Sequence, residues 1–497
     1  MSDLEDEATK QGNLLRDKGD FDGAIAAYTE AIRLHPHNAQ PYSSRGQAYF
    51  RKGEWAKAIA HCNKAIQLDP TMAEAYCTRA SSHGSSGDLD NAMADCTEAI
   101  RLDPHRAEAY HVRGIVYGQK GDSDRAIADC TEAIRLNPKL SKAHYNRGNA
   151  YLTKREFDKA IADFTEAIRL GLRHAEVYSG RACAYSKKGE FDKAVADYDD
   201  AIRLDPTQAT MYYNRGLDCV KKADYDKAIA DFTEAIRLNP KDAEAYYNRG
   251  CTYGEKGDYE KAIADFTESI RLDPRRAEFY GGRAYAYCEN GEFAKAIADY
   301  TGALRLKPQC AKSYWWRAYV YLEKGELDKA IADFTESIRL DPRHAEFYSG
   351  RAYAYYKNGE FEKAIADYNA AMRLNPTYAE AYFGRACSYR KKGDHDKAIA
   401  DFTDAIRLNP EYAEAYYNRG HTYAEQADHD KAITDYTAAI RITPNDGCTF
   451  YARGYSYSHK HEKAKADADF AQADTLGYKP GKYSGILRRF CFWRQNR

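Results

Sequence analysis

The fourteen residues KAIADFTESIRLDP occur twice, at 261–274 and at 329–342. The two copies start 68 residues apart, which is twice 34. Proline keeps the same period: twelve prolines from Pro36 to Pro444 follow one another at intervals of 34 residues, with one interval of 68 where Leu172 stands instead. A fixed period of about 20–50 residues indicates a repeat architecture.

Counting 34-residue units from Glu5 gives fourteen repeats that end at Pro480, and we number positions 1–34 within each. Position 8 is Gly or Ala and position 20 is Ala in every repeat, and position 27 is Ala or Ser. Positions 4 and 11 are each Tyr in eleven repeats, position 24 is Phe or Tyr in eleven, and position 32 is Pro in twelve. These positions recur at three and four residues in two groups, which predicts two amphipathic helices per repeat.

This pattern resembles the tetratricopeptide repeat family, which has aromatic residues at positions 4, 11 and 24, small residues at 8, 20 and 27, and Pro at 32. The resemblance covers nearly the whole chain and implies an all-α fold, a right-handed α-solenoid of antiparallel helix pairs. The residues agree with it, because small residues at positions 8 and 20 allow close helix packing, Gly at position 15 ends the first helix and Pro ends the second. Since one repeat cannot bury its own apolar faces, stacked neighbours must share a core.

We expect three parts in the chain. Residues 1–4 form an acidic N-terminal cap, residues 5–480 a single solenoid of fourteen repeats, and residues 481–497 a basic and aromatic capping helix or tail. In the last part, apolar residues fall at helical spacing: Tyr483, Ile486, Leu487, Phe490 and Trp493. The alternative to a cap is that the Lys and Arg residues of this tail contact an acidic partner or an anionic membrane surface.

Two charged positions depart from the usual family pattern. Position 7 is Arg in thirteen repeats, from Arg45 to Arg453, and position 23 is Asp in twelve, from Asp95 to Asp469. We hypothesise a ladder of Arg–Asp pairs that joins the first and second helices along the array. The alternative is that both side chains are solvated, where an ion pair contributes little to stability.

The resemblance implies that ligands bind in a concave groove lined by positions 2, 5, 6, 9, 12 and 13. Repeats 9–11 deviate most at these positions, and their candidate partner-binding residues are Trp315, Trp316, Tyr285, Tyr319, Tyr353, Gly282 and Gly350. Trp and Tyr are enriched at binding hot spots, and Gly within a helix costs roughly 0.5–1 kcal/mol relative to Ala. Two interpretations stay open, an aromatic binding pocket and internal packing of large rings beside small residues.

Asparagine at position 6 is a second candidate feature, since some family members use it to bind the backbone of an extended peptide. Asn214 and Asn248 lie in adjacent repeats, and plain exposure of both is the alternative. A clamp for a C-terminal carboxylate, which chaperone-binding relatives have, is not expected. Its five positions hold Thr9, Asn13, Ser44, Glu74 and Thr78, of which only Asn13 matches the family.

The charges and cysteines exclude several classes of function. Lys plus Arg number 74 and Asp plus Glu 75, so the balance disfavours a general nucleic-acid binder and a polybasic membrane anchor. The acidic start MSDLEDEATK has no apolar core of a signal peptide, and no apolar run reaches the ~18 residues of a transmembrane helix. Twelve scattered Cys without a C-x-x-C pair indicate a reducing, cytoplasmic location.

Position 13 alternates in charge along the array, with Lys357 and Lys391 after three successive Glu residues. A solvated rim is the simpler interpretation of these charges.

Cys62, Cys96 and Cys130 replace the aromatic residue at position 24 in three successive repeats. A stacked metal site is conceivable, but buried cysteine acting as a small apolar residue is the preferred interpretation.

No cofactor is expected, and the sequence has no P-loop, H-E-x-x-H, G-x-S-x-G or dinucleotide-binding motif. We therefore expect a non-catalytic scaffold that binds a peptide, helix or protein partner. The alternatives are a structural spacer or self-assembling subunit and, disfavoured by charge, an RNA-binding solenoid.

Overall fold

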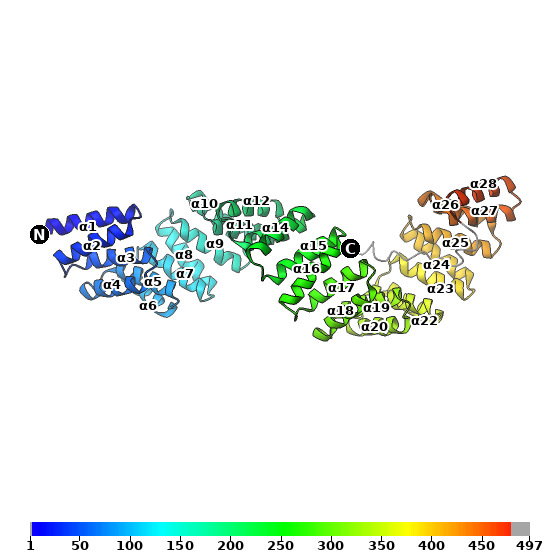
Figure 1. The fold of residues 1–497 in the computed structure, drawn as a ribbon, viewed down its shortest axis with the longest axis horizontal. Coiled ribbons are helices and arrows are strands. Elements are labelled where there is room, and N and C mark those ends of the chain that lie inside the picture. Colours follow the sequence, from blue (N-terminus) through cyan, green and yellow to red (C-terminus); the bar gives the residue numbers. More distant parts are fainter. Residues whose placement is uncertain (1, 479–497) are drawn as a thin grey trace. The chain divides into compact units, whose positions relative to one another are not determined.

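The computed structural model describes residues 2–478, which form α-helices joined by short turns, with no strand in that range (Figure 1). This confirms the all-α fold. The predicted capping helix at 481–497 lies outside the described residues. The chain divides into two compact units, Met1–Lys256 and Gly257–Arg497. Each is a stack of antiparallel helix pairs, and a single solenoid over 5–480 stays a prediction.

In the first unit, odd-numbered helices are the first helices of their repeats: α1 (Ser2–Asp17), α3 (Ala39–Arg51), α5 (Ala73–Ser86), α7 (Ala107–Gln119), α9 (Ser141–Thr153), α11 (Ala175–Lys188), α13 (Ala209–Lys221) and α15 (Ala243–Glu255). The second helices are α2 (Phe21–Leu34), α4 (Trp55–Leu68), α6 (Leu89–Leu102), α8 (Ser123–Leu136), α10 (Phe157–Arg169), α12 (Phe191–Leu204) and α14 (Tyr225–Leu238).

In the second unit, the first helices are α17 (Ala277–Glu289), α19 (Ala311–Glu323), α21 (Ala345–Lys357), α23 (Ala379–Lys391), α25 (Ala413–Glu425) and α27 (Gly447–His459). The second helices are α16 (Tyr259–Leu272), α18 (Phe293–Leu306), α20 (Leu327–Leu340), α22 (Phe361–Leu374), α24 (His395–Leu408), α26 (His429–Ile442) and α28 (Lys463–Thr475).

Small residues at positions 8 and 20 set the close packing within each pair. Position 20 is Ala throughout and is buried in every repeat, as at Ala228. At position 8, a Cβ added to Gly216 would lie 2.9 Å from the ring of Phe232, the position-24 residue of the same repeat. Because that distance is shorter than a van der Waals contact, the ring occupies the space that glycine leaves.

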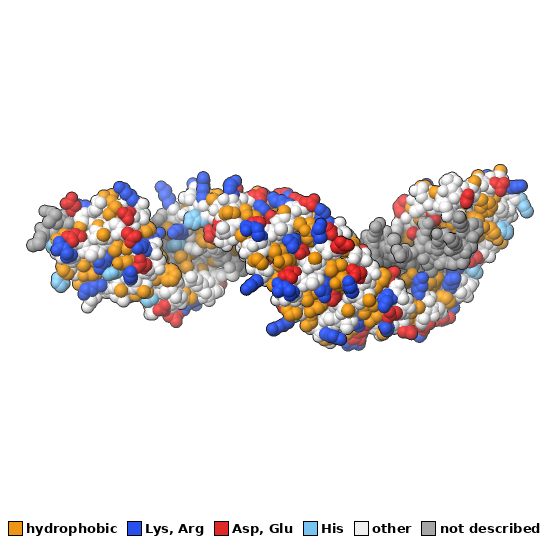
Figure 2. Space-filling view, in the orientation of Figure 1, with side chains coloured by type: hydrophobic (Ala, Val, Ile, Leu, Met, Phe, Trp, Pro, Cys, Tyr) orange, Lys and Arg blue, Asp and Glu red, His pale blue; other side chains and the backbone are white. Residues whose placement is uncertain are grey.

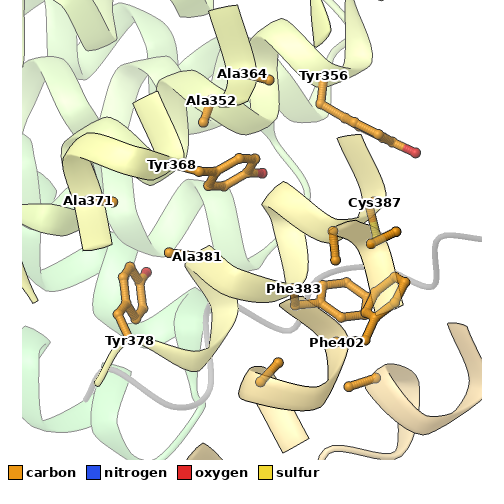
Figure 3. Packing of buried hydrophobic residues seen from close by; sticks show 14 of the residues in the cluster. Ala352, Tyr356, Ala364, Tyr368, Ala371, Tyr378, Ala381, Phe383, Cys387 and Phe402 are labelled. Carbon is orange, nitrogen blue, oxygen red and sulfur yellow. The ribbon is translucent and has the colours of Figure 1, made fainter. Parts of the chain in front are cut away.

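Each core then extends into the next repeat. Figure 3 shows one such cluster, in which Tyr368 of α22, Tyr378 before α23, Phe383 of α23 and Phe402 of α24 pack together with small alanines. The rings of Phe383 and Phe402 are 5.6 Å apart. Since these residues come from two successive repeats, no repeat buries its apolar face alone, as expected for a repeat array.

The turn between the two helices of a repeat needs a left-handed residue at position 15. Glycine supplies it in most repeats, as at Gly325 with a φ of 75°. Four repeats instead place Arg155, Ala223, Ala427 and His461 there, with φ values of 58–61°. The geometry of the turn is therefore imposed by the packing of the helices even where the residue does not favour it.

The predicted Arg–Asp ladder is confirmed. In repeats 3–7 and 9–14 the position-7 guanidinium donates through Nε and Nη2 to both carboxylate oxygens of the position-23 Asp. In repeat 6 these bonds join Arg181 and Asp197 at 2.7 Å each. The carboxylate is buried, with Asp197 only 5% exposed, so these pairs are not solvated surface pairs.

The ladder also connects neighbouring repeats. Nη1 of Arg181 donates to the hydroxyl of Thr165 at 3.0 Å, and Thr165 is at position 25 of the preceding repeat. The same bond, to Thr, Asn or Asp, recurs in repeats 2, 3, 5–8 and 9–14. One arginine thus connects its own helix to two others, the second helices of its own and of the preceding repeat. The planar guanidinium, with donors on several sides, suits this geometry.

Most first helices contact the first helices of the adjacent repeats, for example α19 with α21 and α21 with α23 in the second unit. Second helices do not contact one another to a comparable extent within residues 2–478. The first helices are therefore closer together and line the inner side of each stack. We call this surface the first-helix face. None of the helices in the described range is both long and apolar enough to cross a membrane.

Candidate partner-binding surface

The structure places all seven candidates of repeats 9–11 on three consecutive first helices of the second unit. Gly282 and Tyr285 lie on α17, the two tryptophans and Tyr319 on α19, and Gly350 and Tyr353 on α21. Helix α19 contacts α21, and the ring of Tyr285 on α17 contacts Trp316 on α19, so the sequence positions identify neighbouring parts of the first-helix face. We call Tyr285, Trp315, Trp316 and Tyr319 the aromatic cluster.

The rings of the aromatic cluster contact one another edge to face. Ring centroids of Trp315 and Trp316 are 4.5 Å apart with an interplanar angle of 66°, and those of Trp315 and Tyr319 are 4.7 Å apart at 78°. Tyr285 reaches Trp316 from the preceding repeat at 6.2 Å. This arrangement is favourable beyond the burial of area, by about 0.5–1.5 kcal/mol per pair, and it fixes the orientation of both indoles.

The residues of the aromatic cluster differ in how deeply they are buried. Tyr319 is only 7% exposed and packs on Phe334 at 5.3 Å, so it belongs to the core. Trp315, Trp316 and Tyr285 are partly exposed. Trp315 rests on the core around Phe334, and Trp316 on the core around Tyr300. One side of each tryptophan therefore packs against the core, while another part of each side chain remains available to a ligand.

Close packing explains why residue 350 is glycine. A Cβ added there would lie 2.6 Å from the ring of Phe334, the position-24 residue of the preceding repeat. Gly180 and Gly384 meet Phe164 and Tyr368 in the same way. The packing interpretation thus explains Gly350, and Tyr353, half-buried beside it, packs against the cores on both sides.

The two asparagine candidates lie in the first unit and interact with neighbouring residues. Asn248 on α15 donates through Nδ2 to the hydroxyl of Tyr213 at 3.0 Å and to the carbonyl oxygen of Glu244 at 2.8 Å. Asn214 on α13 lies beside Tyr198, whose pKa is raised by burial and lowered by the nearby side chain of Asn214. These side chains are not simply solvated, and their role in holding a peptide stays a prediction.

Two charged residues that break the repeat pattern are not among the sequence-predicted candidates. Asp218 at position 10 is 2% exposed, although position 10 is uncharged in every other repeat. Its Oδ1 accepts from the Ser186 hydroxyl at 2.6 Å, while Oδ2 is buried without a hydrogen-bond partner. Burial raises the pKa of Asp218, an effect opposed by the Ser186 hydrogen bond and the charge of Lys187.

Arg390 is the second. At position 12 only Arg16 and Arg390 are charged, and that comparison across repeats could have identified it. Arg16 donates to Asp17 and Gln47. Arg390 forms no ion pair with any residue in the described range, and its Nη1 is buried without a hydrogen-bond partner.

No group of three or more His, Cys, Asp or Glu residues within residues 2–478 is arranged to hold a metal ion. Cys62 and Cys130 are fully buried, and burial raises the pKa of each thiol to about 12. Sγ of Cys62 would lie 2.8 Å from a Cβ at Gly46. The cysteines at position 24 therefore fill the space that aromatic rings fill elsewhere, in agreement with the preferred interpretation.

Family models described as tetratricopeptide repeat or TPR repeat match nearly the whole array. One matches residues 9–73, 282–342, 317–379 and 383–447. Others match 107–140, 141–170 and 243–276, 184–217 and 218–257, and 73–106. The comparison with curated proteins gave no match.

Solved structures with a similar fold share little sequence with this chain. The Cut9–Hcn1 hetero-tetramer of the APC/C is 17% identical, with 91% of this chain and 96% of that chain covered and a TM-score of 0.41. Yeast Tom70 is 20% identical over 86% and 97%, with a TM-score of 0.38. YrrB, described as a TPR protein with an unusual peptide-binding site, is 24% identical over 36% and 92%, with a TM-score of 0.34.

Proposed function

Because this chain belongs to the tetratricopeptide repeat family, we propose that it is a non-catalytic scaffold that binds a protein or peptide partner on the first-helix face of repeats 9–11. The observation that carries the proposal is the pair of partly exposed tryptophans, Trp315 and Trp316, fixed by edge-to-face contacts. Large aromatic side chains held rigidly before binding lose little entropy when a ligand covers them.

The charge distribution supports a protein partner over a nucleic acid. The net charge is −1, and Figure 2 shows basic and acidic side chains interspersed on the face in view. A general nucleic-acid binder needs a continuous basic surface. The cytoplasmic location and the absence of a chaperone-type carboxylate clamp stay predictions.

The test compares proteins captured from a lysate by the intact chain and by Trp315→Ala/Trp316→Ala, with quantitative mass spectrometry. Trp55→Ala is the matched control, since Trp55 is 40% exposed on α4 of the first unit. We expect one or more proteins to be lost from the double variant, at unchanged helicity, and retained by the control. Identical capture by all three chains would contradict the proposal, and concentration-dependent self-association would favour the self-assembling alternative.

A further inference from the structure

The first-helix face of the second unit contains a cation without a counter-ion. Many other arginines of the described chain have acidic partners: most position-7 residues bind Asp, and several residues near the ends of second helices bind the acid three positions earlier, as Arg407 binds Asp404 at 3.0 Å. Arg390 has neither kind of partner, and its Nη1 is buried and lacks a hydrogen bond. A buried donor left unsatisfied is costly, more so when it is charged.

The groups around Arg390 come from three repeats and do not neutralise it. Its charge opposes the pKa rise that burial causes in Tyr356 of α21 and Tyr436 of α26, and it adds to the effect of burial in lowering the pKa of His421 of α25. Tyr356 and Cys387, another neighbour, are labelled in Figure 3. Glu425, whose carboxylate lies 3.2 Å from Nδ1 of His421, forms no ion pair with Arg390.

Two further cations lie on the same stretch of the first-helix face. Lys391 follows Arg390 in α23 and is exposed, and Lys357 of α21 places its Nζ 5.5 Å from the ring centroid of Tyr353. Tyr353 stacks on Tyr356 at 6.5 Å, with an interplanar angle of 8°. The tyrosines of α21 thus connect the basic stretch to the core that supports Trp315.

We propose that Arg390, assisted by Lys357 and Lys391, binds an acidic side chain of the partner, in a peptide segment whose apolar residues contact the aromatic cluster. This deepens the proposed function and rests on it. A guanidinium binds a carboxylate through two parallel hydrogen bonds, and such charge-assisted bonds are about twice as strong as neutral ones. Arg390 is partly exposed, so a ligand can reach it from solvent. Position 12 is not among the positions of the chaperone-type clamp, and an internal Asp or Glu suffices as ligand.

The test measures binding of a fluorescein-labelled hexaglutamate peptide with an amidated C-terminus to the purified full-length chain, by fluorescence anisotropy at low salt. We expect Arg390→Leu, which carries the residue found at position 12 in repeats 5 and 10, to weaken binding at least fivefold. Arg407→Leu removes the same charge from an exposed site on α24 and should change binding less than twofold. Arg390→Lys, which keeps the charge but loses the fork, should fall between the two.

Equal affinity of the intact chain and Arg390→Leu, or equal losses in both leucine variants, would overturn the inference, because binding would then reflect general charge. Binding of oligouridylate that Arg390→Leu abolishes, with no hexaglutamate binding, would also overturn it and identify a phosphate site. The peptide assay does not depend on the tryptophans. A failure here with selective capture loss in Trp315→Ala/Trp316→Ala would therefore leave the proposed function standing.

Discussion

At the scale of single residues, the ladder shows how one substitution changes the energetics of a repeat. In repeat 2, position 23 is His61 instead of Asp. Nη2 of Arg45 contacts Nδ1 of His61 at 3.2 Å. Nε of Arg45 is buried without a partner. Burial, with the charges of Arg45 and Lys57, lowers the pKa of His61 to about 4. The ring is therefore neutral at pH 7 and leaves the guanidinium without a counter-ion.

Restoring the acid should stabilise the first unit. We expect His61→Asp to raise the free energy of unfolding by about 1 kcal/mol at pH 7, because a carboxylate accepts from both Nε and Nη2. The measurement is urea unfolding followed by circular dichroism. The reverse exchange, Asp129→His in repeat 4, should lower stability, and a gain in both variants would show that the ladder is not the cause.

Asp218 predicts a pH dependence of stability. Its pKa is raised in the folded state, so its protonated form favours folding, and this contribution is complete below the unfolded pKa of about 3.9. The contribution is lost as the pH rises through the folded pKa. Asp218→Ala should therefore be more stable than the intact chain at pH 7, by about 1–3 kcal/mol, and the difference should shrink towards pH 4.

Urea unfolding of both chains at several pH values between 4 and 7 tests this expectation. Ala is a suitable replacement because it occupies position 10 in repeats 5, 6, 9 and 11. A stability difference that is constant over this range would mean that packing, and not the buried charge, determines the effect.

At the scale of helices and turns, repeat 5 shows that the chain can end a second helix without proline. Its α10 stops at Arg169, and Gly171 with a φ of 93° follows where most other repeats have Asp or Asn before Pro. The amide of Leu172 donates to the carbonyl of Ala167 at 3.0 Å, as in a glycine-terminated helix. Two different local sequences thus produce the same helix pair, because the packing of the next repeat selects the conformation.

The turn at position 15 gives the prediction at this scale. Ala223 adopts a φ of 58°, which is unfavourable for a residue with a Cβ. We expect Ala223→Gly to stabilise the α13–α14 pair by about 1 kcal/mol, after allowing for the entropy glycine adds to the unfolded chain. Hydrogen exchange of the two helices measures the change. Gly325→Ala, the opposite exchange in repeat 10, should accelerate exchange in α19 and α20, and faster exchange in both variants would contradict the argument.

At the scale of the whole molecule, stability in a repeat array is a sum of local terms and nearest-neighbour contacts. The division of the chain into two compact units allows a test of whether destabilisation stays local. Phe402 is fully buried in the core of α21–α24, and replacing it with Ala should cost about 3–5 kcal/mol. We expect Phe402→Ala to accelerate amide exchange in α21–α26 and to leave α1–α14 unchanged.

Phe164→Ala is the matched control in the first unit, since Phe164 is equally buried at the same repeat position. It should accelerate exchange around α9–α12 only. Acceleration throughout residues 2–478 by either variant would show that the repeats unfold as one cooperative body, and this result would support the prediction of a single solenoid.

The sequence by itself determined the repeat, the helix pair and the ladder. Helical spacing of apolar residues and the 34-residue period depend on local geometry, and Arg and Asp at positions 7 and 23 lie on the two helices of one hairpin. The sequence also located the two tryptophans, but it left open whether they bind or pack. It could not separate buried Tyr319 from partly exposed Trp316, since both occupy positions that the family pattern assigns to the groove.

Only the tertiary structure decided contacts between repeats, because these depend on how each pair is rotated against the next. Arg181 therefore reaches Thr165 of the preceding repeat as well as its own Asp, and Gly350 fits against Phe334. For the same reason, only the fold revealed that Arg390 has no acid within reach. A charge without a partner is a property of the space around it, and that space is formed by three successive repeats.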